Sequence, residues 1–561
     1  MVEKLINSKW AKFWFALSVA AFVGLQIRMG NVFVMALNIF AAFALAIFVE
    51  CKYAISSKLL EAKSKKHALI ALLIAIYTVI EMVLGFYSQK IARVFADEYH
   101  PFAVELRGFL PEQIFGFEIH TVLVVFIAIA GMIALPAIFV VAYAITSHFK
   151  NFAAKVWRGT EQHERVYFVA TVSIFGLFVA AAYSLSPIFW GSNELPNYGF
   201  DFFFGLDVGY AIHLDGQFIT TASARITRLF FPLVNFPFAL IARMLSRILF
   251  FVPFAYVYFL QLFHICLMAC GGILLARMCN IVGFSKKCFL ALYSVSYSFL
   301  VFSIPPERYV LPTFCIILFI YVCARFPKAK YVAAIVAAGT LTTNLAVFPF
   351  VAYAKKFKQW FFNLVKLGCG FVAACILGGI LIRLFDPVQA ILGELDRFAG
   401  GIDPRERILQ FINFVGSIFI RPETTLAYGT DQHGMDVIRY VLAVPTSVNW
   451  IGILLIMLAI AGFILNRKLR FAQISLLWAA YAFLILFVIG WQARGNEMFL
   501  SAFYFGWAFF VLAFLLVEKL LEKQKAIKYL AYSAVFVAMA IINISGIIEL
   551  IRFGIQHYPA R

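Results

Sequence analysis

The chain has 561 residues, of which 63% are hydrophobic and 13% are charged. Soluble globular proteins carry about 25% charged residues, so this composition excludes an ordinary soluble fold and predicts an integral membrane protein. The formal net charge of +19 comes from short basic clusters between apolar runs rather than from one continuous patch. Such clusters are typical of membrane topology, and the sequence predicts no nucleic-acid partner.

Apolar runs long enough to cross a bilayer recur from end to end. They predict an all-α fold, a polytopic transmembrane helical bundle of about 13–15 spans. If the N-terminal lysines at positions 4–12 lie in the cytoplasm, every later dense basic cluster lies there too, as the positive-inside rule requires. We therefore expect a cytoplasmic N-terminus. The acids, the arginines and the longest loops then lie outward, so we expect the working face there, and the absence of sorting signals favours a bacterial inner membrane.

The first four expected spans form an N-terminal region, residues 1–165. A fifth span, 166–190, opens a transmembrane core expected at 166–528, and the last region, 529–561, holds a terminal span and an outward tail. Loops of unusual length often have a function, and two of them interrupt the core on the outward side. The four N-terminal spans are expected at 13–27, 31–50, 68–88 and 120–147, and the two outward loops at 191–247 and 385–445.

The core continues as apolar runs joined by short turns. The sequence PPERY, residues 305–309, makes one outward turn, and WQARGNEMF, residues 491–499, makes another. The run ERILQFINFVGSIF, residues 406–419, has apolar residues at helical spacing and predicts an amphipathic helix within the second long loop. The further spans are expected at 250–276, 288–304, 310–324, 331–343, 345–354, 360–384, 447–465, 472–490, 498–517 and 529–550.

The first long loop contains two acids in an almost wholly aromatic stretch, YGFDFFFGLDVGY, residues 198–210. A carboxylate at the membrane edge among aromatic rings is desolvated, which raises its pKa toward the range of a general base. Asp207 is the better candidate for this role, with a helix cap or an ion pair to Arg225 as the alternative. Asp201 and Asp215 are weaker candidates for the same cavity, and a cap or an arginine partner is the favoured alternative for both.

The outward segments contain many arginines but only one lysine, Lys90. A guanidinium group binds phosphate or carboxylate through two parallel hydrogen bonds, which suits an anionic ligand. Arg225 and Arg228, three residues apart, would share one face of a helix, and Arg494 lies in a later outward turn. These three are the candidate phosphate-binding residues. Snorkelling at the interface and pairing with nearby acids is the alternative reading of each.

Three further polar residues complete the candidate cavity. Glu307 in PPERY is placed by proline at an external turn, with an exposed turn acid as the alternative. Glu497 lies near Arg494 in the sequence, so the two either bind a head group or pair with each other. Asn344 in TLTTN either lines the cavity or, as we favour, caps or bridges neighbouring helices.

No cofactor is firmly predicted. The nine cysteines include no C-x-x-C pair and lie in or next to the expected spans, so we expect them to be small buried residues. The sequence has no P-loop, no H-E-x-x-H and no G-x-S-x-G with a triad, so ATP hydrolysis, zinc proteolysis and serine hydrolysis have no support. A divalent metal held by the outward acids stays an open alternative.

The motifs, taken in order, resemble the GT-C superfamily of membrane glycosyltransferases, which includes protein O-mannosyltransferases and the aminoarabinose transferase of lipid A. A span leads to an outward loop with an acid, FGLDVGY, and then to an arginine-rich segment with a proline-containing apolar helix, RITRLFFPL. PPERY, TLTTNLAVFPF and WQARGNEMFLSAFYF follow in the expected order. The likeness covers residues 166–520 and is greatest to bacterial GT-C-like proteins.

The resemblance implies transfer of a sugar from a polyprenyl-phosphate carrier to a glycan, lipid or protein acceptor at the outer face, among membrane lipids. Asp207 would deprotonate the acceptor, and Arg225, Arg228 and Arg494 would bind the departing lipid phosphate. One alternative is a transporter or flippase of an anionic or lipid-linked substrate, which would place ionisable groups near the middle of the membrane. Another alternative is a polymerase or ligase of surface polysaccharide. It would use the same kind of lipid-linked donor, so only an assay of the product distinguishes it from a glycosyltransferase.

Overall fold

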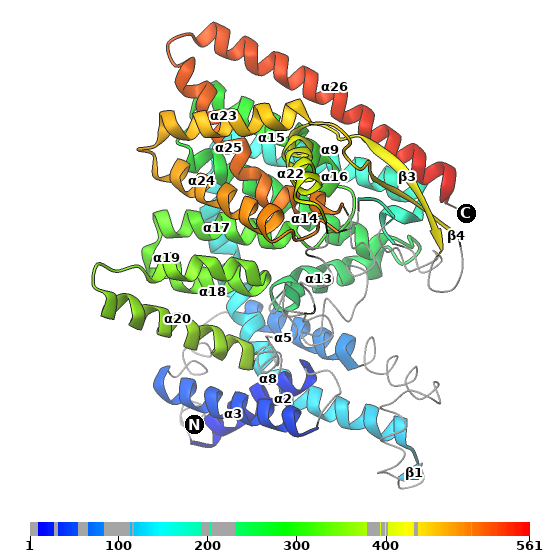
Figure 1. Ribbon diagram of the computed structural model, residues 1–561. Helices are drawn as coiled ribbons and strands as arrows, with labels where there is room; N and C mark the ends of the chain where they lie inside the picture. The colour runs from blue at the N-terminus through cyan, green and yellow to red at the C-terminus, as the bar shows by residue number, and fades with distance from the viewer. Residues whose placement is uncertain are drawn as a thin grey trace. The chain divides into compact units, whose positions relative to one another are not determined.

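The computed structural model is mostly helical, and its described part also contains two antiparallel hairpins, so the expectation of a purely helical fold needs that correction (Figure 1). The chain divides into two compact units. Unit 1 consists of residues 1–160, 214–240 and 338–387, and unit 2 of residues 161–213, 241–337 and 388–561. The residues whose structure is described are 9–26, 32–53, 65–83, 113–114, 117–191, 202–204, 231–377, 393, 399, 402–430, 436–494 and 496–560.

The helices of unit 1 pack through small side chains. Ala75, Ala134 and Ala239 are fully buried together with larger residues such as Leu25 and Met82. An alanine at such a contact lets two helix backbones approach closely. The elements of this unit are α2 (Lys9–Gln26), α3 (Val32–Tyr53), α5 (Lys65–Ile80), β1 (Gln113–Ile114), β2 (Phe117–Glu118), α8 (Ile119–Arg158), η5 (Thr342–Val347), α19 (Phe348–Ala352) and α20 (Phe357–Leu377), and both α13 (Phe231–Ile248) and α18 (Lys330–Thr340) continue from one unit into the other.

Helix α8 of unit 1 contains a proline. Pro136 lies inside this helix, where it has no N–H to donate and where its ring disturbs the preceding turn. Ser18 of α2 compensates, because its Oγ donates to the carbonyl of Ala134 over 3.2 Å and accepts from the N–H of Ala137 over 2.8 Å. Lipid offers no hydrogen bonds to the backbone, so a spanning helix that contains a proline needs a partner of this kind from its neighbours.

Unit 2 is arranged around α25 (Ala502–Leu520), since 94% of the residues in the apolar 18-residue window within Met498–Leu520 are buried. In the larger hairpin, β3 and β4 pair antiparallel with Leu426 opposite Tyr440. The other elements are α9 (Gln162–Leu185), η2 (Pro187–Phe189), α14 (Ala255–Met278), α15 (Gly283–Val295), α16 (Tyr297–Phe302), α17 (Val310–Arg325), η4 (Pro327–Ala329), α22 (Pro404–Phe419), β3 (Thr424–Thr430), β4 (Asp436–Leu442), α23 (Trp450–Asn466), α24 (Arg470–Ala482), the π-helical η7 (Phe483–Val488), η8 (Met498–Ser501) and α26 (Lys525–His557).

Two glycines of α23 set how closely its neighbours approach. A Cβ atom at Gly462 would overlap the backbone carbonyl of Leu512 in α25, and one at Gly452 would overlap the carbonyl of Ile412 in α22. Both obstacles are backbone atoms, which cannot move aside as a side-chain tip can. The α23–α25 and α23–α22 contacts therefore depend on glycine at these two positions.

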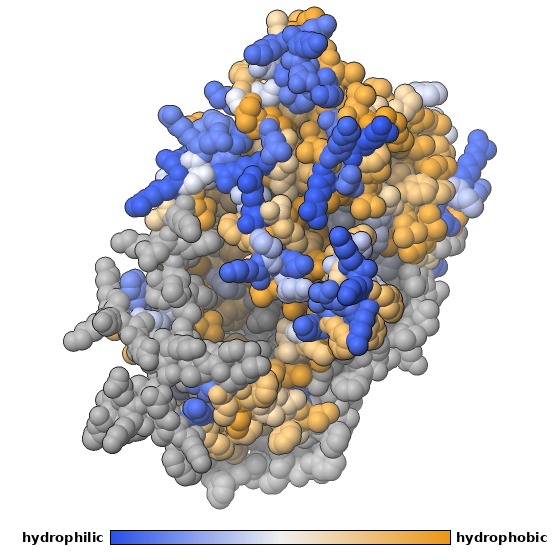
Figure 2. Space-filling model, turned by 90° about the vertical axis from the view of Figure 1, so that its left-hand side faces the viewer, coloured by the Kyte–Doolittle hydropathy of each residue, from blue (hydrophilic) through white to orange (hydrophobic). Residues whose placement is uncertain are grey.

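The structure confirms a mostly helical protein with membrane-spanning character. Seven helices in the described part are long and apolar enough to cross a bilayer, and six shorter apolar helices accompany them. Every span expected from the sequence overlaps one of the described helices. Large apolar side chains such as Ile174, Leu177 and Leu530 are exposed, and Figure 2 shows wide apolar areas on one face of the molecule. Such surface is suited to contact with lipid.

Candidate functional site

Four segments that are distant in the chain meet at one end of unit 2. They are residues 202–204, the turn 305–309, the β3–β4 hairpin and the turn 490–497, which together we name the turn cluster. Hydrogen bonds or ring contacts join each segment to another. All four belong to segments that the sequence analysis expects on the outward side. The cluster is therefore the candidate functional site.

The turn 305–309, between α16 and α17, is buried along its whole length. Its two prolines restrict the backbone, and the carboxylate of Glu307 accepts a 2.7 Å hydrogen bond from the N–H of Arg308. Glu307 is 0% exposed, so the alternative of an exposed turn acid is wrong. Gln261 of α14 donates to two carbonyls at the end of α16, which fixes the chain as it enters the turn.

The turn 490–497 joins η7 to η8 and contacts two other parts of the cluster. Buried Gln492 donates from Nε2 to the Tyr309 hydroxyl over 3.2 Å and accepts at Oε1 from Ser501 Oγ over 2.7 Å. Asn496 donates to two carbonyls at the end of β4, over 3.2 and 3.3 Å. This turn thus connects the turn 305–309 to the hairpin.

Strand β4 is hydrogen-bonded along both edges. One edge pairs with β3. On the other edge, the backbone of Tyr440 forms hydrogen bonds with the backbone of Phe202 and Phe204. On the same edge, the backbone of Ile438 forms hydrogen bonds with the Tyr558 hydroxyl. Burial raises the pKa of the Tyr440 and Tyr558 phenols above the ordinary value. Tyr558 therefore stays protonated near neutral pH, so it can donate to the carbonyl of Ile438 and accept from its N–H.

Only residues 202–204 of the aromatic stretch 198–210 lie in the described part. Phe204 adopts a φ of 55°, which is rare for a bulky side chain. Its ring contacts that of Phe499, with centroids 5.1 Å apart, and that of Tyr297, with centroids 6.2 Å apart. These contacts attach the start of the acid-bearing segment to the WQARGNEMF motif. The predicted site residues outside the described part of the chain are Asp201, Asp207, Asp215, Arg225 and Arg228.

The other predicted site residues are described. Within the turn cluster Glu307 is buried, Arg494 is exposed and Glu497 is half-buried. Asn344 belongs to unit 1, where it is buried in η5 and its N–H donates to the carbonyl of Leu341 over 2.9 Å. The residues that hold the cluster together were not predicted, although three of them lie inside the PPERY and WQARGNEMF motifs; they are Tyr309, Tyr440, Gln492, Asn496 and Ser501.

Ion pairs join three helices at the opposite end of unit 2. Glu164, at the start of α9, is fully buried and pairs with Arg277 of α14 and, at 2.6 Å, with Lys286 of α15. Lys286 also pairs with Glu161 at 2.9 Å. Because the charge of the buried acid is paired with the charges of two cations from other helices, we interpret this group as a structural contact between the helix ends.

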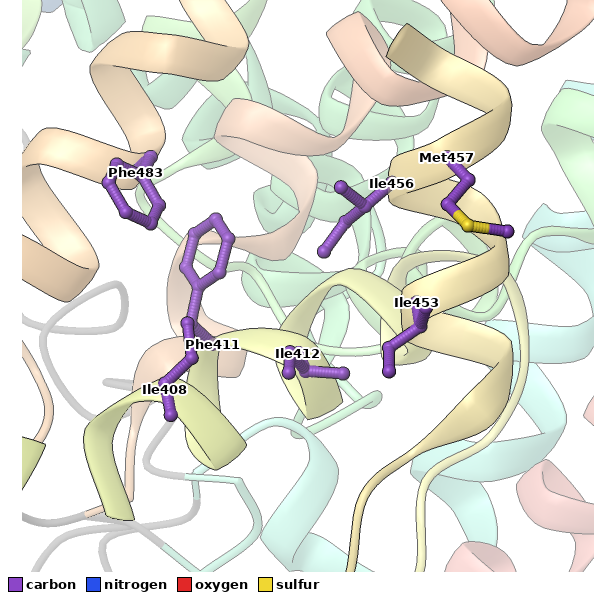
Figure 3. Close-up of a pocket in the computed structure, with 7 residues that line it drawn as sticks. All are labelled: Ile408, Phe411, Ile412, Ile453, Ile456, Met457 and Phe483. Carbon is purple, nitrogen blue, oxygen red and sulfur yellow. The ribbon is translucent and has the colours of Figure 1, made fainter. Parts of the chain in front are cut away.

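A separate cavity of about 250 Å³ lies between α22, α23 and η7. Figure 3 shows the Phe411 ring between Phe483 and Ile456, and every side chain that lines the cavity is apolar. It can therefore receive an apolar chain but offers no group for acid–base chemistry. In the described ranges, no group of three or more His, Cys, Asp or Glu residues could hold a metal ion.

No family model matches the chain, and neither a curated protein nor a solved structure shows significant similarity to it. The functional argument therefore depends on the sequence motifs and on the turn cluster. The cluster brings buried Glu307 and exposed Arg494 to one end of unit 2, next to the beginning of the acid-bearing segment. The cluster therefore places a buried acid, an exposed cation and several aromatic rings in one part of unit 2.

Proposed function

We propose that the protein is a membrane glycosyltransferase of GT-C type, which transfers a sugar from a polyprenyl-phosphate-linked donor to an acceptor at the outer face of the membrane. The turn cluster is the observation that carries this proposal. Three of the motifs whose order resembles GT-C enzymes contact one another there, through the Phe204–Phe499 rings and the Gln492–Tyr309 hydrogen bond. Segments that contribute to one catalytic cavity must lie together in this way.

The chemistry assigns a role to each group. The acceptor hydroxyl attacks the anomeric carbon of the donor sugar while Asp207, three residues after Phe204, takes the hydroxyl proton. The bond between that carbon and the phosphate oxygen breaks, and the lipid phosphate leaves with the electron pair. Arg225, Arg228 and Arg494 stabilise the negative charge that develops on the leaving phosphate. The apolar cavity beside α22 and α23 lies in the same unit and is lined only by apolar side chains.

The placement of ionisable groups favours this proposal over a transporter or flippase. Transporters bind their cargo with polar groups near the middle of the membrane. In the described part of unit 2, Glu307 and Arg494 lie at one end, and Glu164 with its cations lies at the other. His264, buried within α14, is the exception.

Release of polyprenyl phosphate tests the proposal directly. The full-length protein would be reconstituted in vesicles with a panel of polyprenyl-phosphate sugars and candidate acceptors, and the free lipid phosphate would be measured. We expect Asp207→Asn to abolish release while the protein still inserts and folds, because the amide cannot accept the proton. Glu522→Gln, a change at an exposed acid just after α25 and outside the turn cluster, is the control and should keep full activity.

Full turnover by the Asp207→Asn variant would sink the assignment. Movement of intact lipid-linked sugar across the vesicle membrane, without sugar transfer, would instead establish the transporter alternative. The length of the glycan product separates the transfer of one sugar from the polymerase or ligase alternative.

A further inference from the structure

Backbone strain in unit 2 is concentrated in the turn cluster. In the described part of the chain, four residues other than glycine have left-handed φ angles, and three of them belong to the cluster: Phe204, Gln492 and Asn496. Gln492 has a φ of 65° and Asn496 one of 52°, within a single turn that begins at Gly490, whose φ is 77°. Residues held in this region persist only where their surroundings enforce it, and they gather at functional sites.

The two strained residues of the turn are also the residues that anchor it. Gln492 is 5% exposed, and its amide bridges Tyr309 and Ser501. Asn496 bonds through its side chain to carbonyls at the end of β4, and its own N–H donates to the carbonyl of Ala493 over 3.1 Å. The left-handed backbone is thus fixed on both sides of Arg494.

Arg494 lies midway between these anchors and is exposed, whereas its neighbour Ala493 is fully buried. A guanidinium group binds phosphate best when its orientation is fixed, because less rotational freedom is then lost on binding. The two anchored residues thus flank one exposed cation.

We propose that Gln492 and Asn496 are positioning residues that hold the turn 490–497 in its strained form, so that Arg494 is presented in a fixed orientation to the phosphate of a lipid-linked substrate. The part of this proposal that concerns the orientation of Arg494 depends only on the fold and not on the proposed function. The identity of the ligand rests on the proposed function.

The first experiment measures the geometry of the turn without any ligand. Spin labels would be attached through genetically encoded residues at position 494 and at Ile464, an exposed residue near the far end of α23, so that the native cysteines stay unchanged. We expect one narrow distance distribution in the parent protein and a broad one in Gln492→Leu and in Asn496→Ala. Gln473→Leu removes the same amide at an exposed site of α24 and should leave the distribution narrow.

The second experiment measures binding in nanodiscs, with undecaprenyl phosphate as the probe and undecaprenol, which lacks the phosphate, as its comparison. Gln492→Leu and Arg494→Gln should each weaken retention of the phosphate form about tenfold and leave retention of the alcohol unchanged. A narrow distribution in both Gln492→Leu and Asn496→Ala would overturn the positioning role. A broadened distribution with unchanged retention of the phosphate would overturn the phosphate ligand.

These outcomes are separate from the test of the general base. If Asp207→Asn abolishes transfer but the turn is not fixed, only the positioning role fails. If the turn is fixed and binds phosphate but Asp207→Asn keeps full transfer, only the proposed general base fails. The asparagine variant also keeps the inference testable if the glutamine variant does not fold, because the Asn496 bonds are only half-buried.

Discussion

Gln492 donates a hydrogen bond to the Tyr309 hydroxyl over 3.2 Å and so joins two turns that are 183 positions apart in the chain. Both partners are buried, and the ring of Tyr309 also contacts Tyr504 with centroids 6.1 Å apart. The bond lies between the PPERY and WQARGNEMF motifs. The contribution of this bond to stability therefore indicates how strongly the two turns of the candidate site are coupled.

Tyr309→Phe removes this hydroxyl and keeps the ring. We expect the free energy of unfolding to fall by about 1–3 kcal/mol, because the buried amide of Gln492 is left without its acceptor. A double-mutant cycle with Gln492→Leu, followed by thermal unfolding in detergent, isolates the pair. Tyr353→Phe, at a residue that is 73% exposed, is the control and should change little. Additive effects in the cycle would show that the two turns are not coupled.

Asn543 of α26 is a buried polar side chain with three backbone partners, away from the candidate site. It is fully buried, donates to the carbonyls of Val295 and Phe419 over 2.7 and 2.6 Å, and accepts from the N–H of Arg421 over 3.0 Å. Asn543→Leu leaves three backbone groups without partners, so we expect a loss of about 3 kcal/mol or more. Ser545→Ala, two residues away and exposed, should cost less than about 0.5 kcal/mol. Equal unfolding midpoints for the two variants would contradict this reading.

The sequence predicted the helices well because apolar run length alone decides where a chain can cross a bilayer. The amphipathic helix expected at 406–419 is α22, Pro404–Phe419, where Asp403 caps the first turn by accepting from the N–H of Arg405. The β3–β4 hairpin in the same loop was missed. Its second strand, DVIRYVL, is rich in β-branched residues, but its polar and apolar residues do not alternate as they do in a half-buried strand.

The site was less predictable than the helices. PPERY and WQARGNEMF were identified by their residues, yet the contact between them depends on the left-handed backbone of Gln492, for which a glutamine gives no local signal. The burial of Glu307 could not be predicted from the sequence either. A glutamate in a turn is usually exposed, and its burial follows only from the packing of the turn against neighbouring helices.

The ion pairs at the opposite end of unit 2 provide a test of buried charge. Glu164→Gln would leave Arg277 and buried Lys286 without their shared carboxylate, and we expect a loss of about 3–5 kcal/mol. Glu161→Gln, whose side chain is 55% exposed, should cost about 1 kcal/mol or less. Thermal unfolding measures both. Replacing Lys286 by Met in the Glu164→Gln background should recover part of the loss, and no recovery would argue against stranded charge as the cause.

Tyr558 predicts how stability depends on alkaline pH. Burial raises the pKa of its phenol above the unfolded value of about 10, so above that pH the unfolded chain loses a proton that the folded chain keeps. The stability is complete below about pH 10 and falls as the pH rises further. Tyr558→Phe should therefore be less stable near neutrality, for lack of the bonds to Ile438, but should lose less between about pH 8 and pH 11.

Unfolding midpoints measured across that pH range check this expectation. Tyr428→Phe removes a phenol that is 74% exposed and should keep the parent slope. A Tyr558→Phe slope equal to that of the parent would show that this hydroxyl is not the group that titrates.

Gly462 tests the close approach of α23 to the central helix α25. A Cβ at this position would overlap the carbonyl of Leu512, which belongs to the backbone of a buried helix. Gly462→Ala should therefore destabilise the protein by about 1–3 kcal/mol, since one of the two helices must shift. Gly368→Ala in α20 is the opposite case, because nothing lies within 4 Å of its Cβ, and alanine favours the helix by up to about 1 kcal/mol. Opposite signs in the two unfolding midpoints would establish the contact, whereas a gain in stability for both variants would show that α23 and α25 can separate freely.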